Sequence, residues 1–457
     1  MGILNFIFKY QKFFIIAPVI LGITALFDRN LAVAIIFIVF LLSAALFALN
    51  KLGQNRIIFL IFLFVFLFQI LAVLFMYYAH FQPFSSGRGD YTSYDLYGKE
   101  IANRIRSGNF SLEGIHDMSH YYPVVVGVIY ALTAPDMLLG QLFNAWLTAL
   151  IAVFVYLICI EIGSSVRGAV LVSAIVNFYP SLVFFGGLLV RDSLVALLAT
   201  AGLYFIILMM KSFSWIKFAI FYLALLVLIH FRFYIGYSLI VSFLFCWIFF
   251  ADLEIKKRLL YLLIIIPLLG FLPAISGQGY LGIGYIKSFA NQQTVAFYRE
   301  EAYYNPIDAN NLSQSSANEL YKANTDSTAI TKTGFGNLGL FIKNCAVSFF
   351  SVAFGPFPWQ VKKAKHIFFL IETLPWYLIF LSVVTGAVSA FKSKQKLALP
   401  VALFALITLS VVALYLSSSF GTYIRIRIPA FISLFCLSSL GLSIYLKDKK
   451  FFNFLKI

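Results

Sequence analysis

Long apolar segments separated by short polar ones recur from one end of the chain to the other. A helix of about 20 apolar residues crosses the hydrocarbon core of a bilayer, and fewer suffice where neighbouring helices shield the ends. The pattern therefore predicts an all-α polytopic membrane protein with about 12 transmembrane helices. We expect these spans near residues 13–27, 31–49, 57–79, 138–160, 169–190, 193–210, 218–230, 235–250, 259–273, 366–391, 397–416 and 428–446.

The composition agrees with a membrane protein and excludes a soluble one. Of the 457 residues, 62% are hydrophobic and 11% are charged, whereas a soluble domain has roughly 25% charged residues. The four cysteines stand singly in apolar segments and match neither a zinc-binding spacing nor a disulfide framework. We attribute the net charge of +16 to basic loops beside the membrane, and we expect no nucleic-acid partner.

Lysine and arginine gather at one end of the predicted spans. Loops that retain many basic residues lie on the cytoplasmic side of a membrane. With the N-terminus in the cytoplasm, that side carries the basic groups near residues 9–12, 51–56, 167, 211–217, 256–258, 392–396 and 447–456. We predict an integral protein of a bacterial inner membrane, with its active loops on the outer face.

These assignments divide the chain into four regions. Residues 1–56 form an N-terminal membrane hairpin, and residues 57–273 form a membrane core that contains the outer loop 80–137. Residues 274–365 form a large outer loop, and residues 366–457 form the C-terminal membrane helices. Two apolar segments in the outer loops, 123–134 and 338–359, are expected to be interfacial or re-entrant helices on the outer face. If only one of these segments crossed the membrane, the basic loops that follow it would lie on the outer side. The alternative is that both segments cross the membrane.

The outer loop 80–137 concentrates acidic residues and histidines. Asp90 and Asp95 lie near the start of a helix expected over residues 93–106, where the helix dipole favours an ionised carboxylate. Helix capping alone is the alternative role for either residue. His116 and His120 would share one face of a helix, which is a spacing for metal ligands, and a hydrated loop is the alternative.

Ionisable residues also occur within or beside the predicted spans. Asp192, which follows Arg191, and Glu372 both lie in nearly continuous apolar sequence. A charge inside a bilayer is costly, so such residues usually have a partner or a functional role. An ion pair between Arg191 and Asp192 at the interface is the alternative to a functional role.

Arginines on the predicted outer side are candidates for binding a phosphate. The planar guanidinium group matches phosphate oxygens and stays charged when it is partly buried. Side chains that extend towards the lipid headgroups would explain the same pattern. The candidates are Arg191, Arg232, Arg425 and Arg427.

Several short motifs follow one another in a familiar order. They are Asp90-x-x-x-Tyr94 with Gly108, then Tyr122-Pro123, then Tyr179-Pro180 ahead of Asp192, and finally Arg425-x-Arg427-x-Pro429. In this order and sidedness the chain resembles the GT-C-type polytopic membrane glycosyltransferases, the superfamily of the protein mannosyltransferases and the lipid-A aminoarabinose transferase. The likeness covers residues 80–210 and, more loosely, the C-terminal region. The helix after Asp90 is longer than the family pattern, and a tyrosine replaces the usual acid before the interfacial proline.

The resemblance implies a GT-C-like fold and a sugar transfer at the outer face. The donor would be a sugar linked to polyprenyl phosphate, held by the outer arginines, and the acceptor a glycan, a lipid or a protein. Asp90 or Asp95 would take the acceptor proton as general base, and the anomeric centre would be inverted. A divalent metal cation held by Asp192 or His120 is the one cofactor considered.

Two other classes of function compete with this one. A polymerase or ligase of lipid-linked oligosaccharides would also use arginines and histidines on the outer loops. A flippase or transporter would show internal repeats and charged residues along a central path. No repeat is visible in the sequence, and the charges gather at one surface, which favours an enzyme.

Overall fold

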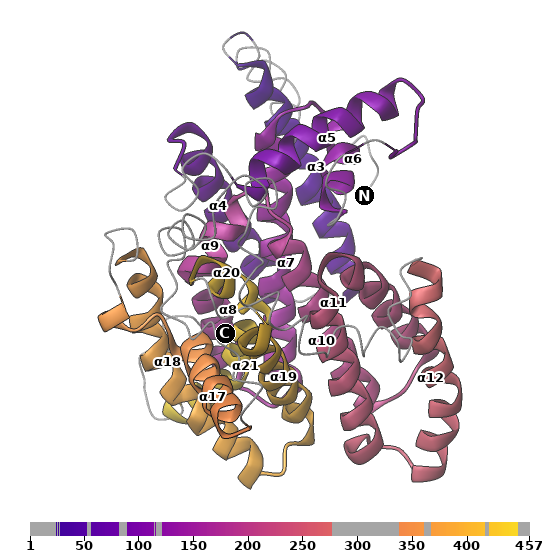
Figure 1. The fold of residues 1–457 in the computed structure, drawn as a ribbon, viewed down its shortest axis with the longest axis vertical. Coiled ribbons are helices and arrows are strands. Elements are labelled where there is room, and N and C mark those ends of the chain that lie inside the picture. Colours follow the sequence, from indigo (N-terminus) through magenta and orange to yellow (C-terminus); the bar gives the residue numbers. More distant parts are fainter. Residues whose placement is uncertain are drawn as a thin grey trace. The chain divides into compact units, whose positions relative to one another are not determined.

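The computed structural model describes residues 24, 26, 28–52, 56–81, 89–113, 115, 121–276, 338–360, 367–415 and 420–446. In these residues all regular structure is helical, and no strand occurs (Figure 1). The chain forms two compact units. Unit 1 comprises Met1–Ala149 and Phe184–Arg191, and unit 2 comprises Leu150–Val183 and Asp192–Ile457.

Eight helices of the described residues are long and apolar enough to cross a membrane. The prediction of a polytopic α-helical membrane protein is therefore confirmed, whereas the predicted number of about 12 spans is not. Residues 1–23, which hold most of the predicted span 13–27, lie outside the described part of the chain. The eight are Arg29–Asn50, Arg56–Tyr78, Met137–Glu161, Asp192–Lys211, Trp215–Phe250, Leu370–Lys392, Lys396–Tyr415 and Ile428–Tyr445.

The segment predicted as one span at 169–190 is broken. It consists of α8 (Val166–Phe178) and α9 (Pro180–Gly187), which are bent by 58° relative to each other. Pro180 has no backbone N–H and disfavours the helical conformation of Tyr179 before it, so the helix ends there. Counting the bent pair as one span raises the number of candidates to nine.

Unit 1 contains two apolar helices and a second helical pair that belongs to the predicted outer loop. The helices α3 (Arg29–Leu52) and α4 (Arg56–Tyr78) contact each other, as do α5 (Asp90–Arg106) and α6 (Tyr122–Leu132). Glycines allow the close approach of α5 and α6. A Cβ atom on Gly98 would lie 2.5 Å from Val126, and one on Gly127 would lie 2.4 Å from Ile101. The first part of α7 (Met137–Glu161) and the end of α9 complete this unit.

Unit 2 is built around the C-terminal helix α21 (Ile428–Leu446), which contacts α8, α10 (Asp192–Lys211), α18 (Ile367–Lys392) and α19 (Leu399–Tyr415). Figure 1 shows α17, α18, α19 and α21 side by side in this unit. Unit 2 also contains α11 (Trp215–Phe250), α12 (Ile255–Ser276), α17 (Leu338–Phe354), α20 (Phe420–Ile426) and the short 3-10 helices η3 (Pro358–Gln360) and η5 (Lys396–Ala398).

Arg232 interrupts α11 (Trp215–Phe250) and allows its two halves to pack against each other. The backbone of Arg232 has φ −153° and ψ 86°, which is not helical. In a straight helix Phe218 and Phe243 would lie roughly 37 Å apart, yet their ring centroids are 6.4 Å apart. The segments predicted at 218–230 and 235–250 are therefore the two antiparallel halves of one sharply bent helix.

Candidate functional site

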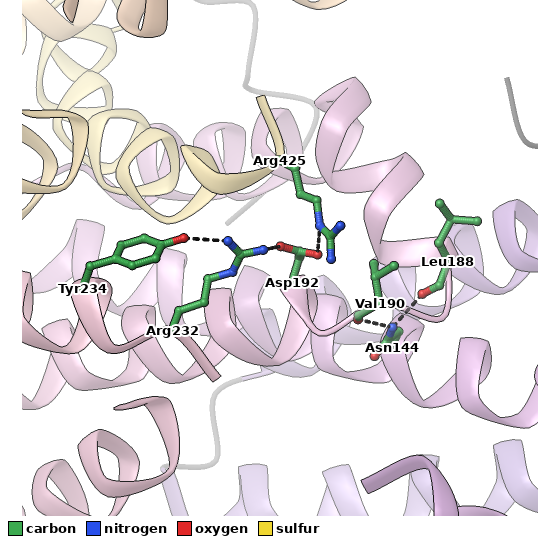
Figure 2. A network of polar contacts seen from close by, with 7 residues as sticks. All are labelled: Asn144, Leu188, Val190, Asp192, Arg232, Tyr234 and Arg425. Atoms are coloured by element: carbon green, nitrogen blue, oxygen red, sulfur yellow. Dashed lines mark hydrogen bonds and ion pairs between the residues drawn. The ribbon is translucent and has the colours of Figure 1, made fainter. Parts of the chain in front are cut away.

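One buried carboxylate of unit 2 is contacted by two arginines that lie far apart in the sequence. The carboxylate of Asp192 accepts a hydrogen bond from Arg232 Nη2 at 2.7 Å, and its other oxygen contacts Arg425 Nε. Arg232 Nη1 donates to the hydroxyl oxygen of Tyr234 at 2.6 Å. Figure 2 shows these four side chains pointing toward one another, and we call them the Asp192 cluster.

Local structure brings each member of the Asp192 cluster into place. Asp192 is the first residue of α10, where the partial positive charge of the helix N-terminus stabilises a carboxylate. Arg232 lies at the break in α11, so its side chain extends from the corner of the helical hairpin. Arg425 lies near the end of the short helix α20, just ahead of α21.

The Asp192 cluster carries more positive than negative charge. Two guanidinium groups face one carboxylate, and both carboxylate oxygens already contact a guanidinium group. Asp192 and Arg232 are buried, with 4% and 5% of their side chains exposed, whereas 17% of the Arg425 side chain is exposed. In this arrangement Asp192 orients the two arginines. Arg425, which is partly exposed, has the chemistry to bind an anion.

A second buried ion pair in unit 2 lies between Glu372 and Arg427. Arg427 Nη2 donates to Glu372 Oε1 at 2.9 Å, and Nη1 donates to the backbone oxygens of Val352 at 2.6 Å and Gly355 at 2.8 Å. The hydroxyl of Ser181 also donates to Glu372. This ion pair, which we call the Glu372 cluster, joins α9, α17 and α18 to the residue between α20 and α21.

Arg425 and Arg427 therefore have different partners, although only one residue separates them. Successive positions on a helical turn project in different directions, which explains why the two side chains diverge. Only 1% of the Arg427 side chain is exposed, and its guanidinium group lies over the ring of Phe431, 4.3 Å from the centroid. Of the two arginines predicted at this motif, only Arg425 has a side chain that is partly accessible.

The two aspartates of the predicted outer loop differ in their surroundings. Asp90 is the first residue of α5 and is exposed. Asp95 lies more than one turn further along the helix, where it accepts from Lys99 Nζ at 2.7 Å and from the hydroxyl of Tyr130 at 2.8 Å. Burial and the nearby Asp95 carboxylate raise the pKa of Tyr130 well above its usual range, so the tyrosine remains a hydrogen-bond donor. Both oxygens of Asp95 are thus occupied within unit 1.

The tyrosines of the predicted motif pack between α5 and α6. Tyr94 is buried and meets Tyr122 edge to face, with ring centroids 5.2 Å apart. Tyr122 donates from its hydroxyl to Asn144 Oδ1 at 2.7 Å. These contacts connect the helix that carries Asp90 and Asp95 to α7.

Sequence reasoning missed Asn144, which anchors a non-helical segment of unit 1. Its amide nitrogen donates to the backbone oxygens of Leu188 at 2.6 Å and Val190 at 2.8 Å (Figure 2). These carbonyl groups follow the end of α9. The Leu188 oxygen also accepts from the backbone N–H of Val190 at 2.9 Å, and the amide of Asn144 supplies the described donor to the Val190 oxygen. The signal in the sequence was an asparagine within a predicted span, because an amide inside a membrane is costly unless it is hydrogen-bonded. In the structure Asn144 is fully buried.

The remaining predicted site residues are placed as follows. Arg191 is half-buried in the turn before α10. His116 and His120 lie outside the described residues. Within the described part of the chain, no group of three or more histidine, cysteine, aspartate or glutamate side chains is arranged to hold a metal ion.

No family model matches the chain, and no curated protein sequence matches it either.

Proposed function

We propose that this protein is a membrane glycosyltransferase that uses a sugar linked to polyprenyl phosphate. The sugar moves to an acceptor hydroxyl at the outer face of a bacterial inner membrane, with inversion at the anomeric carbon. The observation that carries the proposal is the Asp192 cluster, in which two arginines share one carboxylate and leave an excess of positive charge. The order of motifs that resembles the GT-C-type glycosyltransferases supports the same class.

The Asp192 cluster would bind the phosphate of the lipid-linked donor. A guanidinium group held by a buried carboxylate keeps a fixed orientation, and the planar fork of an arginine matches the geometry of phosphate oxygens. Arg425 is the contact residue in this proposal, because it is the more accessible of the two arginines. When the glycosidic bond breaks, negative charge grows on the leaving phosphate, and the arginines stabilise that charge.

Asp90 would act as the general base. The acceptor oxygen attacks the anomeric carbon and forms the new C–O bond as its proton passes to the carboxylate. The bond between that carbon and the phosphate oxygen breaks, and polyprenyl phosphate leaves with the bonding electrons. Proton removal by a positioned carboxylate typically contributes about 10²–10⁴-fold in rate. Asp90 is favoured over Asp95 because the spacing Asp90-x-x-x-Tyr94 matches the motif of the GT-C-type glycosyltransferases.

A polymerase or ligase of lipid-linked oligosaccharides is the second candidate. It would use the same donor phosphate and therefore the same cluster of arginines. The two candidates differ in the acceptor. For a polymerase or ligase, the acceptor is a second lipid-linked glycan or a completed glycan. The products formed from defined acceptors distinguish them.

The test uses full-length protein in lipid nanodiscs with a radiolabelled polyprenyl-phosphate sugar and a panel of acceptors. Release of polyprenyl phosphate measures turnover, and the anomeric configuration of the product measures inversion. Arg425→Gln is expected to reduce kcat/KM by about 10–100-fold, the cost of one charge-assisted hydrogen bond. Arg425→Lys should recover part of this loss, and Asp90→Asn should lower kcat more than Asp95→Asn does.

The control variant is Arg167→Gln, which removes an exposed arginine of the same unit at the start of α8. It should leave turnover unchanged. Full turnover by both Arg425→Gln and Asp90→Asn would refute the proposed site. Transport of the intact lipid-linked sugar without release of polyprenyl phosphate would place the protein in the class of flippases instead.

A further inference from the structure

A cavity of about 470 Å³ lies within unit 2, away from the candidate site. It is partly open and is lined by the end of α11, the end of α18, the start of α19 and the middle of α21. Its walls include Phe250, Ala387, Phe391, Ala402 and Leu437. This volume falls in the range of protein cavities that bind small ligands, which is roughly 300–1,000 Å³.

The cavity is apolar along most of its length and basic at one end. Its polar and charged lining residues are Lys394, Gln395 and Lys396, which follow one another in the turn between α18 and α19. Lys394 is exposed, and Lys396 is more than half exposed, with its Nζ atom 3.5 Å from an oxygen of Asp252. Two cations with a single acidic partner in the described part of the chain leave this end positively charged. An amphipathic anion matches both halves of the cavity.

The basic end of the cavity lies at the opposite end of the helices from Asp192. The backbone N–H of Asp252 donates to the oxygen of Met210 at 2.9 Å, so the end of α11 meets the end of α10. Asp192 is at the start of α10, which is 20 residues long and therefore spans about 30 Å. The lysines of the cavity thus lie about one membrane thickness from the Asp192 cluster.

The cavity extends from this basic end toward the middle of the membrane. Leu437 lines it and lies at the middle of α21 (Ile428–Leu446), roughly 14 Å along that helix from either end. An occupant would therefore place its charge at the membrane surface and its hydrocarbon between the helices. This is the orientation of a phospholipid in a bilayer leaflet.

We propose that this cavity binds an acyl chain of an anionic phospholipid, with Lys394 and Lys396 on its phosphate. Basic pockets between membrane helices on the cytoplasmic side recognise anionic lipid headgroups, and each lysine near the surface strengthens that attraction. The basic loops of this end are those that the distribution of lysine and arginine assigns to the cytoplasm. The inference is independent of the proposed glycosyl transfer, because it concerns the opposite ends of the helices.

The test is lipid titration of delipidated full-length protein, followed by native mass spectrometry. Phosphatidylglycerol and phosphatidylcholine with identical acyl chains serve as probes, and polyprenyl phosphate is the third probe. Phosphatidylglycerol should bind at least about tenfold more tightly than phosphatidylcholine. The double variant Lys394→Gln/Lys396→Gln should lose this preference. Ala402→Phe, which fills the cavity, should weaken the binding of both phospholipids.

The matched control is Lys256→Gln/Lys257→Gln, which removes two exposed lysines near the same end, on α12. It should retain the preference for phosphatidylglycerol. Both lysine pairs are exposed, so each variant is expected to fold, and thermal unfolding of the protein checks this. Equal binding of the two phospholipids, equal effects of the two lysine pairs, or preferential retention of polyprenyl phosphate would each overturn the proposal.

Discussion

Replacing Glu372 with leucine removes the carboxylate that faces the buried guanidinium group of Arg427. Arg427 keeps its hydrogen bonds to the oxygens of Val352 and Gly355, but its charge loses its counter-ion. The hydroxyl of Ser181 loses its acceptor at the same time. Breaking a buried ion pair by removing one partner typically costs about 3–5 kcal/mol in free energy of unfolding. We expect Glu372→Leu to fall in this range.

Arg427→Met should cost a similar amount for a different reason. It leaves the carboxylate of Glu372 buried with Ser181 as its remaining described hydrogen-bond donor, and it leaves two carbonyl groups without their described donor. The double variant removes both charges, so its cost should be smaller than the sum of the single costs by about 2–3 kcal/mol. That difference measures the coupling between the two side chains.

The assay is reversible unfolding in mixed micelles with increasing SDS, followed by circular dichroism. The control is the pair of Lys211 and Glu161, whose charged atoms are 2.7 Å apart but whose side chains are 48% and 21% exposed. The cycle of Glu161→Leu and Lys211→Met should give a coupling of about 0–1 kcal/mol, because water screens an exposed pair. A coupling for Glu372 and Arg427 no larger than that of the control would refute the reasoning.

Two further predictions concern packing and hydrogen bonding inside each unit. In unit 2, Gly386→Ala should destabilise the protein by about 1–3 kcal/mol, because the added Cβ would lie 2.1 Å from the backbone oxygen of Leu437. Gly270→Ala, where nothing lies within 4 Å, should be neutral or stabilising in the same unfolding assay, and equal effects would contradict this account. In unit 1, Asn144→Leu should cost about 2–3 kcal/mol, since it leaves the Val190 carbonyl group and the Tyr122 hydroxyl without their described partner and removes one of the two described donors to the Leu188 oxygen. It should also speed amide exchange at Leu188–Val190, whereas Asn177→Leu, which breaks one described hydrogen bond to Ser173, should leave exchange there unchanged.

Local sequence pattern was sufficient for most helices because apolar length and helix breakers act over neighbouring residues. The apolar segment predicted at 428–446 coincides with α21 (Ile428–Leu446), and the one at 138–160 lies within α7 (Met137–Glu161). The predicted start of the outer-loop helix at residue 93 was three residues late, since α5 begins at Asp90. Gly89, which precedes it, is the N-cap residue and has an extended backbone. The prediction also assigned one span to residues 169–190, where Pro180 divides two helices.

The sequence by itself determined that this chain is a membrane protein of many helices and that a few charged residues, among them Asp192, Glu372 and Arg425, are exceptional in it. A charge in an apolar segment is visible without any structure, because its cost depends on the surrounding residue types. Only the tertiary structure decided which charges meet. Arg232 reaches Asp192 because α11 folds back at Arg232, and Arg425 and Arg427 diverge to two different carboxylates. These pairings depend on how helices distant in the chain pack together, and no local pattern of residues specifies that packing.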